Sequence, residues 1–271
     1  MTIIYSRLSD GTTNPAWLEA RRGKITASQL HRVMGSALVR GNYLTELLVE
    51  RITGELIGHG EMTEAMQNGV DREEEAGERY AQETGATLVP GYWMWANGFG
   101  ATPDFLIDGG GGVEVKCPQP KGAIQARFSE ELGGKWRSGL QYYWQCIGCA
   151  IAADEPWWDL AIYSPELAAV DLDLYTVRYH NGPEIAGRVI DAAFEANAML
   201  DAQFNLAMHA KRRWVESVLI PRIREATSHE AVQECENEVY RLGQGVLPPA
   251  LVKAIDMAVL AKTLSLPDPR V

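Results

Sequence analysis

The segment between residues 104 and 116 constrains the fold of this chain more than any other. Residues 104–108 and 113–116 are rich in branched and aromatic side chains, and four consecutive glycines stand between them. A glycine turn between two such runs is typical of an antiparallel hairpin. Because side chains alternate between the faces of a strand, Glu114 and Lys116 are expected to share one face while Val115 faces the core.

The rest of the chain predicts helices on both sides of a strand group. Helical spacing is expected at residues 17–84, 138–153 and 185–218, and strands at 89–95, 104–108, 113–116, 158–163 and 170–179. This order predicts an α/β (α+β) fold with a central mixed β-sheet flanked by helices. After residue 221 two further helical stretches, 228–242 and 251–264, predict a small helical extension. We therefore expect a main domain over residues 1–220 and an extension over 221–271.

Three helices are predicted within the first part of the chain. Residues 26–29 fit a capping box with Thr26 as the N-cap. A second helix is expected at 43–53 and a third from near Glu61 to Thr84. On the third helix, Glu73 falls on the apolar stripe, while its two acidic neighbours point elsewhere.

Composition sets broad limits on what the chain does. The 271 residues suffice for one substantial core with a small appended domain, and 46% hydrophobic and 23% charged residues are ordinary for a globular protein. No stretch has the pattern of a targeting signal or a membrane span. Four cysteines in this length do not form a disulfide framework. We expect a cytoplasmic protein with reduced thiols and no membrane contact.

A net charge of −11 argues at first against a nucleic-acid partner, because phosphate binding needs Lys and Arg. Net charge does not determine local potential, however, and basic residues are clustered. The clusters are Arg21, Arg22 and Lys24; then Lys116, Lys121, Arg127, Lys135 and Arg137; then Lys211, Arg212 and Arg213. The third cluster is most simply a solvated surface.

Asp104 and Glu114 are the candidate ligands of a metal ion. The hairpin brings the two carboxylates together, and two carboxylates at one point repel unless a cation lies between them. Oxygen ligands select a hard ion such as Mg²⁺ or Mn²⁺. Lys116 beside such an ion is placed to orient a water or to offset charge on a phosphate. The Glu-x-Lys triplet alone is more typical of a strand with a surface ion pair than of a metal site.

Two further positions, Glu73 and Gln145, strengthen the metal hypothesis. A carboxylate such as Glu73 on an apolar helix face is costly unless it is paired, either by a salt bridge or by a metal. Gln145, on the helix after the hairpin, has the amide chemistry to hold a water or a phosphate, although alone it indicates nothing. Cys146 and Cys149 have Cys-x-x-Cys spacing without a second pair nearby, so packed thiols are favoured over zinc ligands.

Arg21 and Ser28 suggest an anion pocket near the N-terminus. Arg21 precedes the predicted capped helix and Ser28 lies in its first turn. Helix N-termini bind anions through free N–H groups and the helix dipole. An ordinary helix cap with a surface arginine is the alternative.

Taken in order, these motifs resemble the phage lambda exonuclease, or YqaJ-like viral recombinase, family of the PD-(D/E)xK nuclease superfamily. The resemblance covers roughly residues 17–165. It rests on Trp17-x-x-x-Arg21-x-Gly23-x-Ile25-Thr26-Ala27-Ser28, Gly69-x-x-x-Glu73-x-x-Ala76, Pro103-Asp104, Glu114-x-Lys116-Cys117-Pro118, Tyr142-Tyr143-x-Gln145 and Tyr163-x-Pro165. The chain departs from the family at Phe105, where relatives usually carry glycine, and in its four-glycine hairpin.

The resemblance implies a restriction-endonuclease-like core and a 5′→3′ exonuclease that digests one strand of linear double-stranded DNA to 5′-phosphomononucleotides. It implies Mg²⁺, with Mn²⁺ as a substitute, held by Asp104, Glu114, the Val115 carbonyl and Glu73. Lys116 and Gln145 would position the attacking water.

The resemblance also implies that Arg21 and Ser28 would hold the 5′-phosphate. It implies a homo-oligomeric ring, with a trimer favoured, and a single-strand annealing protein as partner. A phage or prophage gene acting in the cytoplasm of a bacterial host is the setting it suggests.

Two rival functions stay open. One is an endonuclease or repair nuclease of the same superfamily. The other, of a different class, is an inactive DNA-end-binding recombination scaffold. A third and less specific possibility is an α/β enzyme unrelated to nucleic acid. It predicts no metal at the two carboxylates of the hairpin.

Overall fold

The structure, a computed structural model, describes residues 3–57, 72–129, 136, 139–241, 247 and 249–267. The chain divides into two compact units, Met1–Leu44 with Gly58–Asn197 and Thr45–Ile57 with Ala198–Val271. The division falls inside α3 (Ala37–Thr53) and α8 (Pro183–Trp214) rather than near residue 221. That residues 1–220 form the functional domain stays a prediction.

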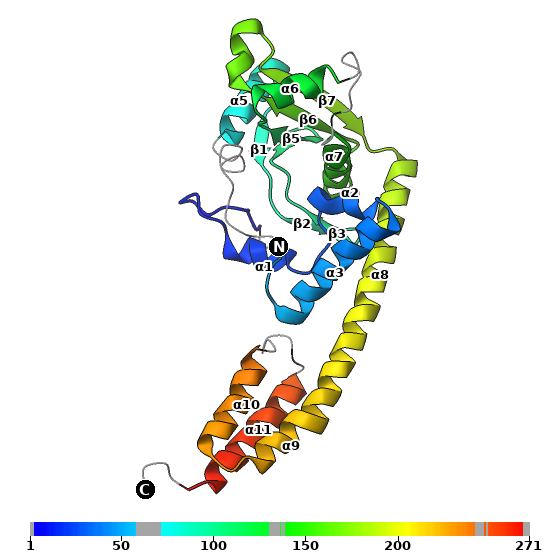
Figure 1. The fold of residues 1–271 in the computed structure, drawn as a ribbon. Helices are drawn as coiled ribbons and strands as arrows, with labels where there is room; N and C mark the ends of the chain where they lie inside the picture. Colours follow the sequence, from blue (N-terminus) through cyan, green and yellow to red (C-terminus); the bar gives the residue numbers. More distant parts are fainter. Residues whose placement is uncertain are drawn as a thin grey trace. The chain divides into compact units, whose positions relative to one another are not determined.

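The first unit is built on a five-stranded mixed sheet (Figure 1). Its strand order is β1-β4-β5-β6-β7, in which only the β5–β6 pair is parallel. The strands are β1 (Leu88–Pro90), β4 (Phe105–Ile107), β5 (Gly112–Lys116), β6 (Trp157–Tyr163) and β7 (Leu174–His180). The predicted hairpin is β4–β5, with Phe105 opposite Val113. The predicted mixed sheet flanked by helices is confirmed.

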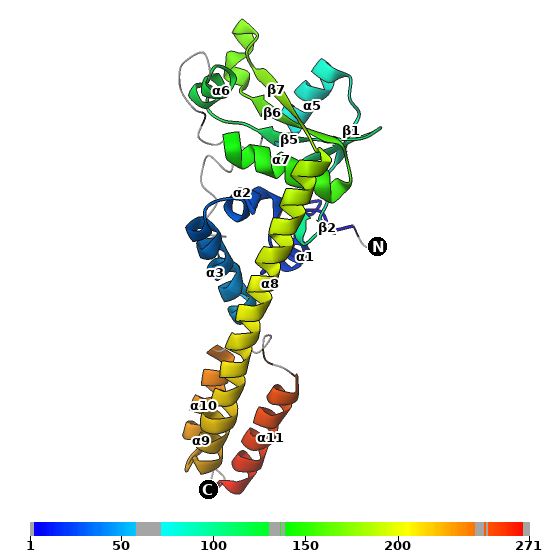
Figure 2. The same cartoon turned by 90° about the vertical axis from the view of Figure 1, so that its right-hand side faces the viewer.

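Helices cover both faces of this sheet, so β5 is buried on both sides. On one face, Val113 and Val115 pack in a buried cluster with Ala76 and Tyr80 of α5 (Glu73–Thr84). The opposite face carries Glu114 and is covered by α7 (Gly139–Ala153), as Figure 2 shows. A strand between two helical layers has no solvent-facing side, and for this reason Glu114 is 1% exposed.

A smaller hairpin and the N-terminal helices complete the first unit. Strands β2 (Met94–Ala96) and β3 (Phe99–Ala101) form a separate two-stranded sheet. Thr26 forms a bridge to Gly100 of β3, just before a 3₁₀ turn (η1, Ala27–Gln29) and the short helix α2 (Leu30–Val33). Helix α1 (Pro15–Arg21) starts at Asn14, whose side chain accepts a hydrogen bond from the Ala16 N–H.

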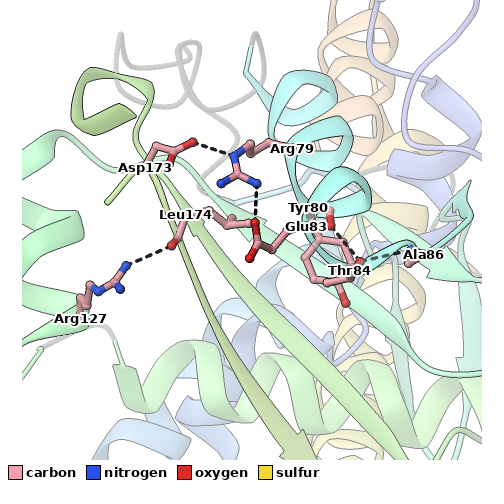
Figure 3. A network of polar contacts seen from close by, with 8 residues as sticks. All are labelled: Arg79, Tyr80, Glu83, Thr84, Ala86, Arg127, Asp173 and Leu174. Atoms are coloured by element: carbon pink, nitrogen blue, oxygen red, sulfur yellow. Dashed lines mark hydrogen bonds and ion pairs between the residues drawn. The ribbon is translucent and has the colours of Figure 1, made fainter. Parts of the chain in front are cut away.

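Polar contacts attach α5 and α6 (Pro120–Arg127) to the start of β7 (Figure 3). Arg79 of α5 donates to Asp173 at 2.8 Å and to Glu83 at 2.9 Å. Arg127, at the end of α6, donates to the Leu174 carbonyl at 3.2 Å. These bonds fix both helices against the sheet from the side opposite α7.

The second unit is helical. The end of α8 continues through a π-helical turn (η3, Val215–Leu219) into α9 (Ile220–Glu225), followed by α10 (His229–Arg241) and α11 (Pro249–Ser265). The last two match the predicted helices of the extension. Their buried faces share one apolar cluster with α9, to which Ile223, Val239 and Ile255 belong. Within the residues described, no helix combines the length and apolarity needed to cross a membrane.

Four local predictions differ from the structure. Thr26 makes no side-chain cap bond; a 3₁₀ turn follows it, and its hydroxyl pairs with Ser28, so no capping box forms. The strand predicted from residue 170 starts at 174, because Pro165 opens a 3₁₀ segment (η2, Pro165–Val170) and Asp171 is left-handed.

The helix predicted at 43–53 begins earlier, at Ala37, where the Ser36 side chain and carbonyl accept hydrogen bonds from the first turn. The strand predicted at 89–95 is divided, because the chain leaves the large sheet at Pro90 and Gly91: residues 88–90 form β1 of the five-stranded sheet and residues 94–96 form β2 of the two-stranded sheet. The start of the helix predicted from near Glu61 lies outside the described residues, and the described helix α5 begins at Glu73.

We predict that Gly91→Ala destabilises the fold beside Asp104. A Cβ at Gly91 would lie 1.8 Å from the backbone oxygen of Pro103, so the strand leading to Asp104 would have to move. Overpacking of this kind costs about 1–3 kcal/mol. Gly187→Ala is the matched control: it meets nothing within 4 Å inside α8 and should stabilise by about 0.5–1 kcal/mol. Urea unfolding measures both, and equal stability of the two variants would contradict the prediction.

Candidate active site

Glu114 lies at the centre of the candidate site, on the middle strand of the sheet. Its Oε1 accepts hydrogen bonds from Lys116 Nζ, two residues along β5, and from Gln145 Nε2 of α7. Gln145 is itself buried, 9% exposed. The predicted shared face of Glu114 and Lys116 is therefore real, but it is an interior face that α7 covers.

Asp104 lies next to this group, directly before β4. The Val115 N–H donates to its Oδ2 at 2.7 Å. Burial raises the pKa of Asp104 above its ordinary value, against the opposing effects of Lys116, the Val115 N–H and Glu114. The hairpin thus brings Asp104 and Glu114 together, as the sequence predicts.

Glu73 joins the group from the first turn of α5. Burial, and then the charge of Asp104, raise its pKa to about 7. Burial and the same neighbour raise the pKa of Glu114 to about 8. Burial alone would lower the pKa of Lys116, but Glu114 and Asp104 outweigh it and raise that pKa well above its ordinary value. The charge of Asp104 raises the pKa of both Glu73 and Glu114, so the three carboxyl groups repel one another. One partly buried ammonium group, that of Lys116, pairs with Glu114, and the cluster therefore favours a further cation.

The donor set fits a hard divalent ion. Oε2 of Glu114 is buried and, among the described residues, has no hydrogen-bond partner. A buried carboxylate oxygen without a donor is costly, and a cation would supply what is missing. Within the part of the chain that is described, no three acidic, His or Cys side chains are already arranged around one point. An ion here would compete with Lys116 and Gln145 for Glu114.

Arg21 and Ser28 line a cavity of about 60 Å³ whose wall also includes Gln145. The Arg21 guanidinium lies 4.4 Å from the centre of the Trp17 ring, and the Trp17 indole donates to Thr102 at 2.8 Å. Gln145 therefore touches both Glu114 and this cavity. The predicted anion pocket and the predicted carboxylate cluster therefore share one residue, Gln145.

Two aromatic residues near Lys116 had no role in the sequence prediction. The Lys116 ammonium lies 5.4 Å from the centre of the Tyr142 ring, and Trp136 packs on Tyr142 with ring centres 5.3 Å apart. Tyr142 belonged to a quoted motif, but nothing in its spacing predicted contact with Lys116. Thr102, which holds Trp17, lies 85 residues further along the chain, and no sequence signal links the two.

The cysteines are thiols, as predicted. All four are free; Cys146 and Cys149 are buried, and burial raises the pKa of both thiols. Burial also raises the pKa of Cys117 to about 11.

Two members of the second predicted basic cluster bind within the fold: Lys116 pairs with Glu114, and Arg127 donates to the Leu174 carbonyl. Lys121 is exposed on α6, and Lys135 and Arg137 lie outside the described residues.

We predict that Mn²⁺ stabilises the protein through Glu114. Because the ion would neutralise buried carboxylates, a concentration 100 times its Kd should add about 2.7 kcal/mol to the free energy of unfolding. Thermal melting with and without Mn²⁺ measures the effect. Glu114→Gln should abolish it, whereas Glu74→Gln, exposed one residue beyond Glu73, should retain it. Equal stabilisation of both variants would place the ion elsewhere.

Comparisons with known proteins identify the family of the chain. Residues 16–154 match the model of the YqaJ-like viral recombinase domain. No curated protein matches the chain. Among solved structures, the alkaline exonuclease LHK-Exo from Laribacter hongkongensis is similar, with 28% identity, a TM-score of 0.64, and coverage of 74% of this chain and 99% of that one. The same exonuclease in complex with dAMP matches at 27% identity and a TM-score of 0.64, with the same coverage.

A phage-related exonuclease from Haemophilus somnus 129PT shares the fold, with 14% identity, a TM-score of 0.54, and coverage of 66% of this chain and 96% of that one. The carboxylate cluster lies on a mixed sheet that these structures have in common, and the family model spans Trp17 to Gln145. The chain belongs to the YqaJ-like viral recombinase family.

Proposed function

We propose that this chain is a Mg²⁺-dependent exonuclease that degrades one strand of linear double-stranded DNA from its 5′ end and serves homologous recombination. The observation that carries the proposal is the double contact of Gln145. Its side chain bonds Glu114 and also lines the cavity of Arg21 and Ser28. A phosphate in that cavity would place the adjoining phosphodiester beside the carboxylates. The proposed products are 5′-phosphomononucleotides.

Each residue has a distinct part in the proposed reaction. Asp104, Glu114 and the Val115 carbonyl would hold the ion, with Glu73 assisting a second position. Bound Mg²⁺ supplies a more acidic water and offsets charge on the phosphate. Lys116, kept protonated by two carboxylates, offsets charge building on the phosphate oxygens. Gln145 orients the attacking water by hydrogen bonds.

Relatives' names support the substrate class. LHK-Exo is titled an alkaline exonuclease, and one of its structures holds dAMP, a nucleotide carrying a phosphate. The proposal includes a homo-oligomeric ring, with a trimer favoured, in which basic residues of several copies would face a DNA channel and offset the net charge of −11. It also includes a single-strand annealing protein as partner. An endonuclease of the same superfamily is the second candidate, which the same carboxylate cluster would equally serve.

Lys116→Ala should reduce digestion of a 5′-phosphorylated linear duplex in Mg²⁺ by about 100-fold or more, because a preorganised charge at the phosphate is lost. Lys253→Ala, which removes an exposed lysine on α11, is the control and should stay near the parent rate. Release of acid-soluble nucleotides over time measures both. An unchanged rate in Lys116→Ala would refute the assignment, and inactivity of the folded parent protein would favour a DNA-end-binding scaffold.

Arg21→Ala should remove the preference for a phosphorylated 5′ end. The parent is expected to digest 5′-phosphorylated linear duplex faster than the 5′-hydroxyl form, and the variant should digest both at one slow rate because the guanidinium no longer holds the phosphate. Arg188→Ala, exposed on α8, should keep the preference. Covalently closed circles should resist all three proteins; cleavage of circles as fast as linear DNA would establish an endonuclease.

A further inference from the structure

Two tryptophans and a lysine form a patch beside the Arg21–Ser28 cavity. Trp93 and Trp95, from the start of the β2–β3 hairpin, are stacked with ring centres 6.5 Å apart and planes 27° apart. The Lys24 ammonium lies 5.3 Å from the Trp95 ring and 6.0 Å from the Trp93 ring. The predicted function gives no role to any of the three.

The two tryptophans differ in what they do for the fold. Trp93 is held in place at two points. Its ring lies over Gly100, where a Cβ would be 2.0 Å from the ring, and its backbone N–H donates to the Ile4 carbonyl at 2.7 Å. Trp95 is 46% exposed. Trp93 thus secures the hairpin, while nearly half of the Trp95 side chain stays in water. A half-exposed indole that stacks on a fixed one is a rigid apolar surface in contact with water.

Lys24 is also fixed in position. Its ammonium donates to the Ala20 carbonyl at 2.7 Å while it lies against both indoles. An ammonium group has three donors, so this bond leaves capacity for an acceptor on a ligand. A flat ring with a fixed cation at its side fits a base stacked on the ring and a phosphate near the cation.

Trp93 connects this patch to the proposed end-binding cavity, because it lines that cavity together with Arg21 and Ser28. At about 60 Å³ the cavity is far smaller than the roughly 300–1,000 Å³ of pockets that enclose a whole small molecule. Its size therefore suits a phosphate group, and the nucleobase attached to that phosphate would lie outside. The exposed indole at Trp95 is the flat surface next to that position.

We propose that Trp95, supported by Trp93 and Lys24, is a stacking platform for an unpaired nucleobase at the DNA end whose terminal phosphate lies in the Arg21–Ser28 cavity. The inference rests on the proposed function and assigns it a new subsite. Because every base has a π face, such a platform would bind all four bases, as an exonuclease without sequence preference requires. It would also hold the end open once its terminal pair has separated.

The test is binding of the full-length protein to 5′-phosphorylated duplexes in EDTA, which prevents digestion. Fluorescence anisotropy gives Kd for the intact duplex and for duplexes with an abasic site at each of the three terminal positions of either strand. Loss of one stacked base corresponds to about 1–3 kcal/mol, so Trp95→Ala should bind the intact duplex about 5- to 100-fold more weakly. Trp95→Phe should recover part of the loss, and Lys24→Gln should weaken binding while Lys24→Arg does not.

The abasic series gives the decisive outcome. At one terminal position, removing the base should weaken DNA binding by the parent until its Kd equals that of Trp95→Ala. The stacking interaction is then absent from both complexes. Phe194→Ala, which removes an aromatic ring that is 54% exposed on α8, is the control and should bind all duplexes like the parent. Unchanged binding in both Trp95 variants, or a loss that is the same at every abasic position, would overturn the platform.

Failure of the platform and failure of the proposed function give different results. Digestion of the same duplexes in Mg²⁺ by the parent reports the function alone. An active parent with Trp95-independent binding refutes only the platform. An inactive parent with base-dependent binding through Trp95 refutes only the nuclease.

Discussion

The structure of the first unit depends on the burial of one carboxylate, Glu114, inside the sheet. Its strand lies between α5 and α7, so the charge has no access to bulk water. Burying a carboxylate is unfavourable unless hydrogen bonds or opposite charges compensate. Lys116 and Gln145 supply part of that compensation through one oxygen, and the second oxygen has no donor among the described residues. The fold therefore retains a local electrostatic imbalance at this point.

That imbalance involves residues from four separate parts of the chain. Glu73 begins α5, Asp104 precedes β4, Lys116 ends β5 and Gln145 lies in the middle of α7. Three of these residues lie within helices or strands and Asp104 directly precedes one. The packing of these elements therefore fixes the separation of the charges. Burial accordingly dominates the raised pKa values of Glu73, Asp104 and Glu114. A centre built in this way is preorganised for charge that develops on a ligand.

The sequence predicted those parts that depend on local pattern. Alternation in 113–116 and the glycine turn located the β4–β5 hairpin, and helical spacing placed Glu73 toward the core and left its neighbours exposed. Contacts between distant segments were not predictable in the same way. The Trp17–Thr102 bond and the stacking of Trp93 on Trp95 beside Lys24 depend on how α1 meets the small hairpin. The strand predicted from residue 170 begins only at 174, although the apolar and polar side chains alternate from 170 onward. Pro165 opens a 3₁₀ segment and Asp171 has a left-handed backbone, and neither conformation is compatible with a strand.

The topology of the sheet has a consequence for the order of folding. β5 pairs with β4 through a short turn, but its other neighbour, β6, begins about forty residues later, after α6 and α7. Strands joined by a short turn pair early, because closing a short loop costs little entropy. The parallel β5–β6 pair can form only after the long connection between the two strands has been closed. The helix α7, which carries Gln145 and covers Glu114, lies in that connection. We therefore expect Glu114 to stay hydrated during folding until the connection packs on the sheet, so that closing the parallel pair also removes water from this carboxylate.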